Sequence, residues 1–186
     1  ITGGAGLLAP FLARAGRNCG RIALSCRRAG DYPSDLANSE EVVELLETAR
    51  PDVVIHCAAM TDVDGCERDP EAADRGNRLT SENLAAALPP DRQLIYISTD
   101  QVYPNVSGPH LEGTEDPVNA RAQKRGGERA ARAHPNGLAL RTSFFGPSQT
   151  PGRKSLSDFI VDSLKAHKPI TLFGDVLFTP LHAETL

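Results

Sequence analysis

The first nine residues, Ile-Thr-Gly-Gly-Ala-Gly-Leu-Leu-Ala, constrain the fold of this chain more than any other stretch. They predict the end of a β-strand, a glycine turn and the start of a helix, the arrangement that holds dinucleotide phosphates in doubly wound α/β sheets. Gly3 would make the tight turn, Gly6 would let the backbone approach a pyrophosphate, and Ala9 replaces the third glycine of the strict pattern. Backbone N–H groups at the helix start, including those of Leu7 and Leu8, would supply the anion site. The alternative is a tight loop that binds nothing.

The rest of the chain alternates predicted strands with predicted helices, which favours the first interpretation. Strands are predicted at 21–26, 52–59, 93–98, 137–141 and 170–173, and helices at 7–16, 40–49, about 70–88, 120–133 and 155–167. This alternation predicts an α/β fold with a doubly wound, mostly parallel (Rossmann-type) sheet. We expect a dinucleotide-binding domain over residues 1–146 and the start of a smaller substrate-binding part over 147–186.

Composition narrows the function classes. A net charge of −4 over 186 residues disfavours a nucleic-acid or membrane-surface partner, since either would need a basic face. The four cysteines lack C-x-x-C spacing and the five histidines do not cluster, so we expect reduced, mostly core thiols, a cytoplasmic location and no metal site. Because the chain starts inside a strand that should be central and stops at Leu186, we expect it to be a fragment of a longer protein.

The end of the second predicted strand bears on the choice of cofactor. Arg27 and Arg28 stand where an acidic residue would bind the ribose hydroxyls of NAD, and arginine there can pair with the 2′-phosphate of NADP. The alternative is two solvated arginines in a loop. The following loop, with Asp35 and Leu36, could meet the adenine.

Two further strands end in residues that could form a site. Cys57-Ala58-Ala59-Met60-Thr61 follows one buried strand, and Thr99-Asp100-Gln101 follows the next. The C-terminal edge of a parallel sheet is where such folds bind ligands. Thr99 could instead cap a turn. Asp64 and Glu67 could form a metal pair, although capping of a helix start is the simpler interpretation.

Six motifs in register resemble one family. They are Thr2-Gly3-x-x-Gly6, Cys57-Ala58-Ala59-x-Thr61-x-Val63-Asp64-x-x-Glu67, Asn77, Ile97-Ser98-Thr99-Asp100, Lys124-x-x-Gly127-Glu128 and Arg141-Thr142-Ser143. The chain resembles the extended short-chain dehydrogenases/reductases, and among them the dTDP-4-dehydrorhamnose reductases. The resemblance implies hydride transfer from NADPH to a keto-sugar carbon, with a tyrosine that protonates the oxygen. A threonine would bind that oxygen, and a lysine would lower the pKa of the tyrosine, whose ordinary value is about 10.

The resemblance assigns a set of site residues. Thr99 and Lys124 would be catalytic. NADP(H) would contact Gly3, Gly6, Leu7, Leu8, Arg27, Arg28, Asp35, Leu36, Cys57, Ala58, Ala59, Asn77 and Lys124. The nucleotide-sugar substrate would contact Thr61, Val63, Asp100, Gln101 and Phe144. Without the resemblance, Lys124 would be a solvated residue of a basic helix.

The catalytic tyrosine of the family is missing. Four residues before Lys124, where the pattern Tyr-x-x-x-Lys requires it, the chain has Ala120. Gln101 and Phe144 also replace a usual tyrosine and a usual tryptophan. The cofactor half therefore matches the family better than the catalytic half does. We expect an NADP(H)-dependent reductase of a nucleotide-linked 4-keto sugar, impaired by the loss of the tyrosine.

Two alternatives remain open. The chain could be a non-catalytic NADP-binding regulatory subunit, similar to the β-subunit of methionine adenosyltransferase, which resembles the same family. It could also be an epimerase or dehydratase of the superfamily, although those enzymes use the tyrosine too. The expected partners are a nucleotide sugar and either a second copy of the chain or a regulated enzyme.

Overall fold

The computed structural model describes residues 1–104, 108–114, 122–172, 174 and 179–186, without the side chains of residues 63 and 122–124. A parallel sheet lies at its centre, formed by β1 (Ser25–Cys26), β2 (Tyr32–Pro33), β3 (Val53–His56), β4 (Gln93–Ser98) and β5 (Gly137–Arg141). Thr2 forms parallel bridges with Ser25 and with His56, so the first strand lies between β1 and β3. With Thr2 counted as strand 1, the order is 3-2-1-4-5-6, as in dinucleotide-binding sheets.

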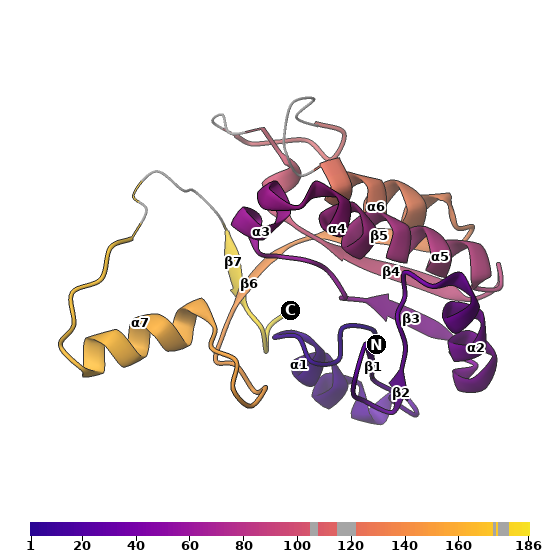
Figure 1. Ribbon diagram of the computed structural model, residues 1–186, viewed down its shortest axis with the longest axis horizontal. Helices are drawn as coiled ribbons and strands as arrows, with labels where there is room; N and C mark the ends of the chain where they lie inside the picture. The colour runs from indigo at the N-terminus through magenta and orange to yellow at the C-terminus, as the bar shows by residue number, and fades with distance from the viewer. Residues whose placement is uncertain (105–107, 115–121, 173, 175–178) are drawn as a thin grey trace.

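Helices pack on both faces of this sheet, as predicted (Figure 1). The side chains of Leu94 and Tyr96 in β4 belong to a core shared with α2 (Ser39–Ala49), α5 (Thr80–Ala87) and α6 (Ala122–Ala133). Ile97, on the opposite face of the same strand, packs instead with Leu8 and Phe11 of the α1 segment (helix Ala9–Ala15). The predicted doubly wound α/β fold is therefore confirmed.

Local sequence signals account for several element bounds. The side chain of Asn38 accepts a hydrogen bond from the Glu40 N–H at 3.0 Å and begins α2, and Arg50 in the left-handed region (φ +46°) ends it. Ser155 and Asp158 form a reciprocal capping box at the start of α7 (Leu156–Lys165). β4 and β5 have the predicted bounds, and short 3-10 turns lie at η1 (Gly16–Asn18) and η3 (Asp100–Val102).

The predicted helix over 70–88 is interrupted. After α3 (Val63–Arg68), the chain forms α4 (Pro70–Asp74), a π-helical turn at η2 (Arg75–Leu79) and then α5. Asn77 lies in this turn and is 2% exposed, and both ends of its amide bond the backbone of Met60. The wider turn is of the kind often found at functional positions. Here it directs Asn77 beneath the loop that follows β3.

The prediction of a strand at 170–173 is wrong over residues 170–172, which form no strand. Thr171 and Leu172 are exposed, so β-forming residue types had no sheet edge to pair with. The strand in this region is β7 (Pro180–His182), which pairs in parallel with β6 (Ser143–Phe145). Because β6 precedes residue 146 and β7 follows it, this small sheet joins the two parts that we expected to divide there.

Two smaller expectations can be compared with the structure. The thiols are not in the core, because Cys19 is exposed and the other three are only partly buried. Of these three, Cys57 packs at the border of the hydrophobic cluster of Leu8 and Phe11. Within the described residues, no helix is both long enough and apolar enough to cross a membrane.

Candidate functional site

The glycine turn is pressed against the loop that follows β3. Gly3 has φ +70°, and a Cβ built there would lie 2.7 Å from the Ala58 backbone nitrogen. The Gly6 N–H donates to the Gly3 carbonyl at 2.7 Å and closes the turn, after which α1 begins at Ala9. At the start of α1, Pro10 has no N–H and the Phe11 N–H donates to the Leu8 carbonyl at 3.0 Å, so an anion would have to bind the N–H groups that precede Pro10. The turn lies where the sheet order reverses, which is the ligand-binding position of open α/β sheets.

A buried polar network supports this turn from below. Thr2 Oγ1 lies 2.7 Å from His56 Nδ1 and accepts the Ala58 N–H at 3.4 Å, and His56 Nε2 lies 3.1 Å from Ser81 Oγ. Ser81 donates its only hydroxyl proton to the Asn77 carbonyl at 2.9 Å, so Nε2 donates to Ser81, and in the neutral imidazole Nδ1 accepts from Thr2. Sequence analysis missed the role of His56, because a single histidine in an apolar strand gives no signal.

Asn77 acts on the site indirectly. Its Oδ1 accepts the Met60 N–H at 2.9 Å and its Nδ2 donates to the Met60 carbonyl at 3.3 Å. Its side chain is 2% exposed and holds the loop of Ala58 and Ala59, which are themselves partly exposed. The assignment of Asn77 as a cofactor contact stays a prediction.

The side chains of Leu8 and Leu36 are buried as well. They are 3% and 6% exposed and belong to the two hydrophobic clusters, because each faces the packed side of its segment. Only their backbone groups could meet a ligand, and the Leu36 carbonyl already accepts Asn83 Nδ2 at 3.0 Å. Leu7 is partly buried in the same cluster as Leu8.

Arg27 shares an acidic partner with a second arginine, Arg75, that was not expected. Asp35 Oδ1 is 3.7 Å from Arg27 Nη2, and Asp35 Oδ2 is 3.3 Å from Arg75 Nη2. Partial burial opposes ionisation of Asp35, but the Ala37 N–H and the two guanidinium groups outweigh it and lower its pKa. Arg28 is exposed. Sequence analysis missed Arg75, since nothing local marks it among the charges of its helical segment.

The residues that follow β4 form the neighbouring part of the same edge. Thr99 Oγ1 accepts the Gln101 N–H at 3.2 Å and donates to Asp100 Oδ1 at 3.2 Å, so this threonine does cap the short turn η3. Thr61 and Gln101 are exposed, Cys57 is partly buried, and Phe144 packs partly buried beside α1. Lys124 lies in α6 and Val63 lies in α3, but the structure does not describe the side chain of either residue. Ala120 lies outside the described residues.

A buried ion pair fixes α6 to the sheet four residues after Lys124. Arg141 donates to both carboxylate oxygens of Glu128 at 2.9 and 2.8 Å, and also to the Glu112 carbonyl at 2.8 Å. Its guanidinium carbon lies 4.8 Å from the ring centre of Tyr103. Burial opposes ionisation of Glu128, but hydrogen bonds from Arg141 prevail and lower its pKa. Burial, together with Glu128, raises the pKa of Tyr96, which makes this phenol a poorer proton donor.

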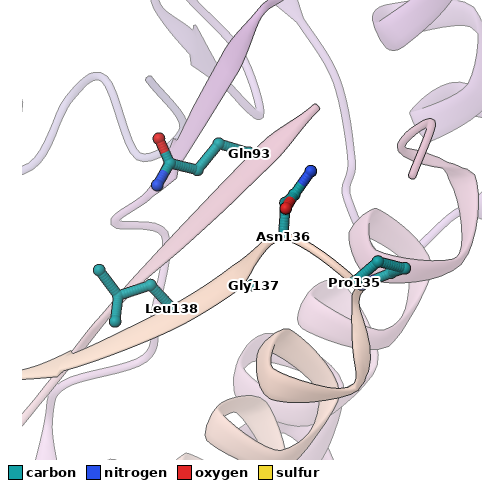
Figure 2. Close-up of a pocket in the computed structure, with 5 residues that line it drawn as sticks. All are labelled: Gln93, Pro135, Asn136, Gly137 and Leu138. Carbon is teal, nitrogen blue, oxygen red and sulfur yellow. The ribbon is translucent and has the colours of Figure 1, made fainter. Parts of the chain in front are cut away.

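Neither the hollow at the start of β4 and β5 nor the acidic residues of α3 form a candidate site. A hollow lined by Gln93, Pro135, Asn136, Gly137 and Leu138 lies where β4 and β5 begin (Figure 2). It contains no titratable side chain. Among the described residues, no three His, Cys, Asp or Glu side chains gather as metal ligands would. Asp64 and Glu67 do not cap α3, because the helix begins at Val63 and its cap position is Asp62.

Comparison with known proteins identifies the family. A sequence model described as "RmlD substrate binding domain" matches residues 1–186. The chain belongs to this family. A low-salt glycan biosynthesis reductase of Haloferax volcanii is 33% identical over 98% of this chain and 66% of its own length. The dTDP-4-dehydrorhamnose reductase of Escherichia coli K12 is 34% identical over 84% of this chain and 53% of its own. The methionine adenosyltransferase 2 subunit beta of Xenopus laevis is 33% identical over 75% and 44%.

Solved structures agree with this assignment. A dTDP-4-dehydrorhamnose reductase from Clostridium acetobutylicum superposes with a TM-score of 0.85 at 25% identity, over 99% of this chain and 65% of that one. The Bacillus anthracis reductase in complex with NADP gives 0.78 at 26% identity, over 89% and 59%. The RmlD-family chain thus spans between 44% and 66% of the length of the relatives named above. The predicted resemblance to extended short-chain dehydrogenases/reductases is confirmed.

Proposed function

We propose that this chain binds NADP(H) at the glycine turn, and that the protein reduces a nucleotide-linked 4-keto sugar. The observation that supports it most is the contact of Gly3 with the Ala58 backbone at the reversal of strand order, where a Cβ would fill the turn. The residues present fit a dinucleotide, with backbone N–H groups for its phosphates and cations near the adenosine end. Relatives named as reductases, and one solved in complex with NADP, support the same function.

Each side chain then has a defined task. Arg27 and Arg28 bind the 2′-phosphate, and the Asp35–Leu36 backbone meets the adenine. The Thr99 hydroxyl turns its proton from Asp100 to the keto oxygen when the substrate binds. Lys124 binds the nicotinamide ribose. Bound NADPH supplies the hydride. Because Ala120 has no proton to give, a water or Lys124 must protonate the oxygen, and turnover falls by about 10²–10⁴-fold relative to an enzyme with the tyrosine.

The arginine pair makes the cofactor choice testable. We expect the protein to bind NADPH more tightly than NADH in calorimetric titrations, because each arginine adds a charge-assisted hydrogen bond to the 2′-phosphate. Replacing Arg27 and Arg28 by alanine should weaken NADPH binding about tenfold or more and leave NADH binding nearly unchanged. Arg17→Ala removes an exposed charge outside the site and serves as control. Equal affinity of the unaltered protein for NADPH and NADH would contradict the assignment.

A regulatory role is the second candidate, and Ala120 is the observation that favours it. The methionine adenosyltransferase β-subunits among the relatives are subunits of another enzyme by name. If this chain acts in that way, it should bind NADPH, fail to oxidise it with dTDP-4-dehydrorhamnose, and form a complex with a methionine adenosyltransferase catalytic subunit in size-exclusion chromatography. Turnover of the keto sugar without such a complex would exclude this candidate.

A further inference from the structure

A turn from the second part of the chain contacts the glycine turn directly. Thr150 Oγ1 and Arg153 Nη1 both donate to the Ala5 carbonyl, each at 3.2 Å. The Arg153 N–H donates to the Thr150 carbonyl at 3.1 Å, and Gly152 at φ +75° lets the backbone turn tightly enough for both donors to converge. We call residues 150–153 the clamp.

The clamp determines which groups of the glycine turn face outward. In a trans peptide the carbonyl and the following N–H point in opposite directions. With the Ala5 carbonyl held by two donors, the Gly6 N–H points back to the Gly3 carbonyl, where it bonds at 2.7 Å. A carbonyl turned toward a phosphate would repel it, and the clamp prevents that by engaging this oxygen.

The clamp is itself anchored on α7. Asp158 Oδ2 accepts the Ser148 N–H at 2.9 Å, and Ser157 Oγ accepts the Gly146 N–H at 3.2 Å. Hydrogen bonds from the Ser155 and Ser148 backbone lower the pKa of Asp158 and keep it an acceptor. The position of the clamp is therefore fixed by the first turn of a helix rather than by contacts within an open loop.

Arg153 brings a positive charge beside a phosphate-binding backbone. A guanidinium has five N–H donors, and among the described residues its side chain bonds only the Ala5 carbonyl. The residue is exposed. Arginine binds phosphate oxygens through two parallel N–H groups, which a single carbonyl contact leaves available.

We propose that Arg153 is a phosphate ligand of the dinucleotide site, and that its guanidinium binds the pyrophosphate while the clamp holds the Ala5 carbonyl. The site is then closed by two segments: the glycine turn from one side and residues 150–153 from the other. The proposal rests on the proposed NADP(H) function. It also means that the start of the substrate-binding part contributes a residue to the cofactor site.

Paired substitutions test this role. Arg153→Gln removes the charge at the clamp, whereas Lys154→Gln removes the same charge one residue later, where the ammonium pairs with Asp162. In calorimetric titrations, Arg153→Gln should raise the Kd for NADPH about tenfold, and Lys154→Gln should change it less than about twofold. Thr150→Val, which removes only the hydroxyl, should raise it about threefold.

Adenosine 2′-monophosphate separates the pyrophosphate contact from general damage, because it keeps the 2′-phosphate and lacks the pyrophosphate. Its Kd should be the same for the unaltered protein and all three variants. The proposal is contradicted if Arg153→Gln and Lys154→Gln bind NADPH equally well, or if Arg153→Gln also loses adenosine 2′-monophosphate. If the unaltered protein binds NADPH, but Arg153→Gln and Lys154→Gln have equal Kd values for NADPH, only the proposal about Arg153 is contradicted. An unaltered protein that fails to bind NADPH contradicts the proposed function as well.

Discussion

Gly3 occupies a position where the backbone and its neighbours both exclude a side chain. Its φ of +70° is unfavourable for residues with a Cβ, and an added Cβ would meet the Ala58 nitrogen at 2.7 Å and the Cys57 carbonyl carbon at 2.8 Å. Both obstacles are backbone atoms of the loop that follows β3, so they cannot move aside as a flexible side chain would.

We therefore expect Gly3→Ala to lower the free energy of unfolding by about 2–4 kcal/mol and to abolish measurable NADPH binding. Chemical denaturation and calorimetric titration measure the two effects. Gly113→Ala is the control, because its Cβ would meet nothing within 4 Å. A Gly3→Ala protein with unchanged stability and NADPH affinity would show that the turn is not built as described.

Some residues of the candidate site could be predicted from the sequence alone, and others could not. The glycines and the Arg27–Arg28 pair were predictable, because a turn and a strand end are local features of the chain. Arg75 and Arg153 were not. They reach Asp35 across 40 residues and Ala5 across 148, and only the folded sheet brings those segments together. The buried His56 network depends on packing in the same way.

At the scale of elements, the ion pair between α6 and β5 has the largest expected energetic effect. Glu128 and Arg141 have side-chain exposures of 2% and 7%, so removal of either partner leaves a buried charge without its counter-ion. Glu128→Ala should destabilise the fold by about 3–5 kcal/mol. Arg132→Ala is the control and should cost less than about 1 kcal/mol, because Arg132 is 47% exposed and lies 3.7 Å from the same carboxylate. Denaturation curves at neutral pH check both values, and similar losses for the two variants would contradict the assignment.

The same pair predicts a pH dependence. Because Arg141 and its neighbours lower the pKa of Glu128 in the folded state, the carboxylate adds stability above its unfolded pKa. That contribution is lost as the pH falls through the lower, folded-state pKa. When the pH is lowered from about 7 to about 3, the free energy of unfolding should therefore fall less for Glu128→Gln than for the unaltered protein. Asp35, Asp74 and Asp158 have lowered pKa values in both proteins, so only the difference between the two curves isolates Glu128.

Elements differ in how far they could be predicted. α2, β4 and β5 follow from hydrophobic period and end signals that lie within each segment. The π-helical turn at η2 does not, because its shape depends on the bond of Asn77 to Met60, 17 residues away. The strand predicted over residues 170–172 was wrong for the opposite reason. These residues have strand-forming side chains, but no neighbouring strand pairs with them.

For the molecule as a whole, the order of strands determines where chemistry can occur. The first strand lies between β1 and β3, so the glycine turn, the loop after β3 and the residues after β4 share one edge of the sheet. The glycine turn, Arg27 and the loop after β3, which carry most of the proposed cofactor contacts, lie within the described residues. The opposite part depends on Lys124 and on the position of Ala120, for which the family pattern requires a tyrosine.

The substitution Ala120→Tyr tests the catalytic half directly. If the alignment with the family is correct, a phenol at this position lies one helical turn from Lys124, and the ammonium lowers its pKa toward neutrality. We expect NADPH oxidation with dTDP-4-dehydrorhamnose to rise by about 10²–10⁴-fold, with an unchanged Kd for NADPH. Ala120→Phe supplies the same ring without the hydroxyl and should give no gain. High activity with Ala120 in place would mean that another group donates the proton. No gain from tyrosine, with cofactor and substrate still bound, would favour the regulatory subunit.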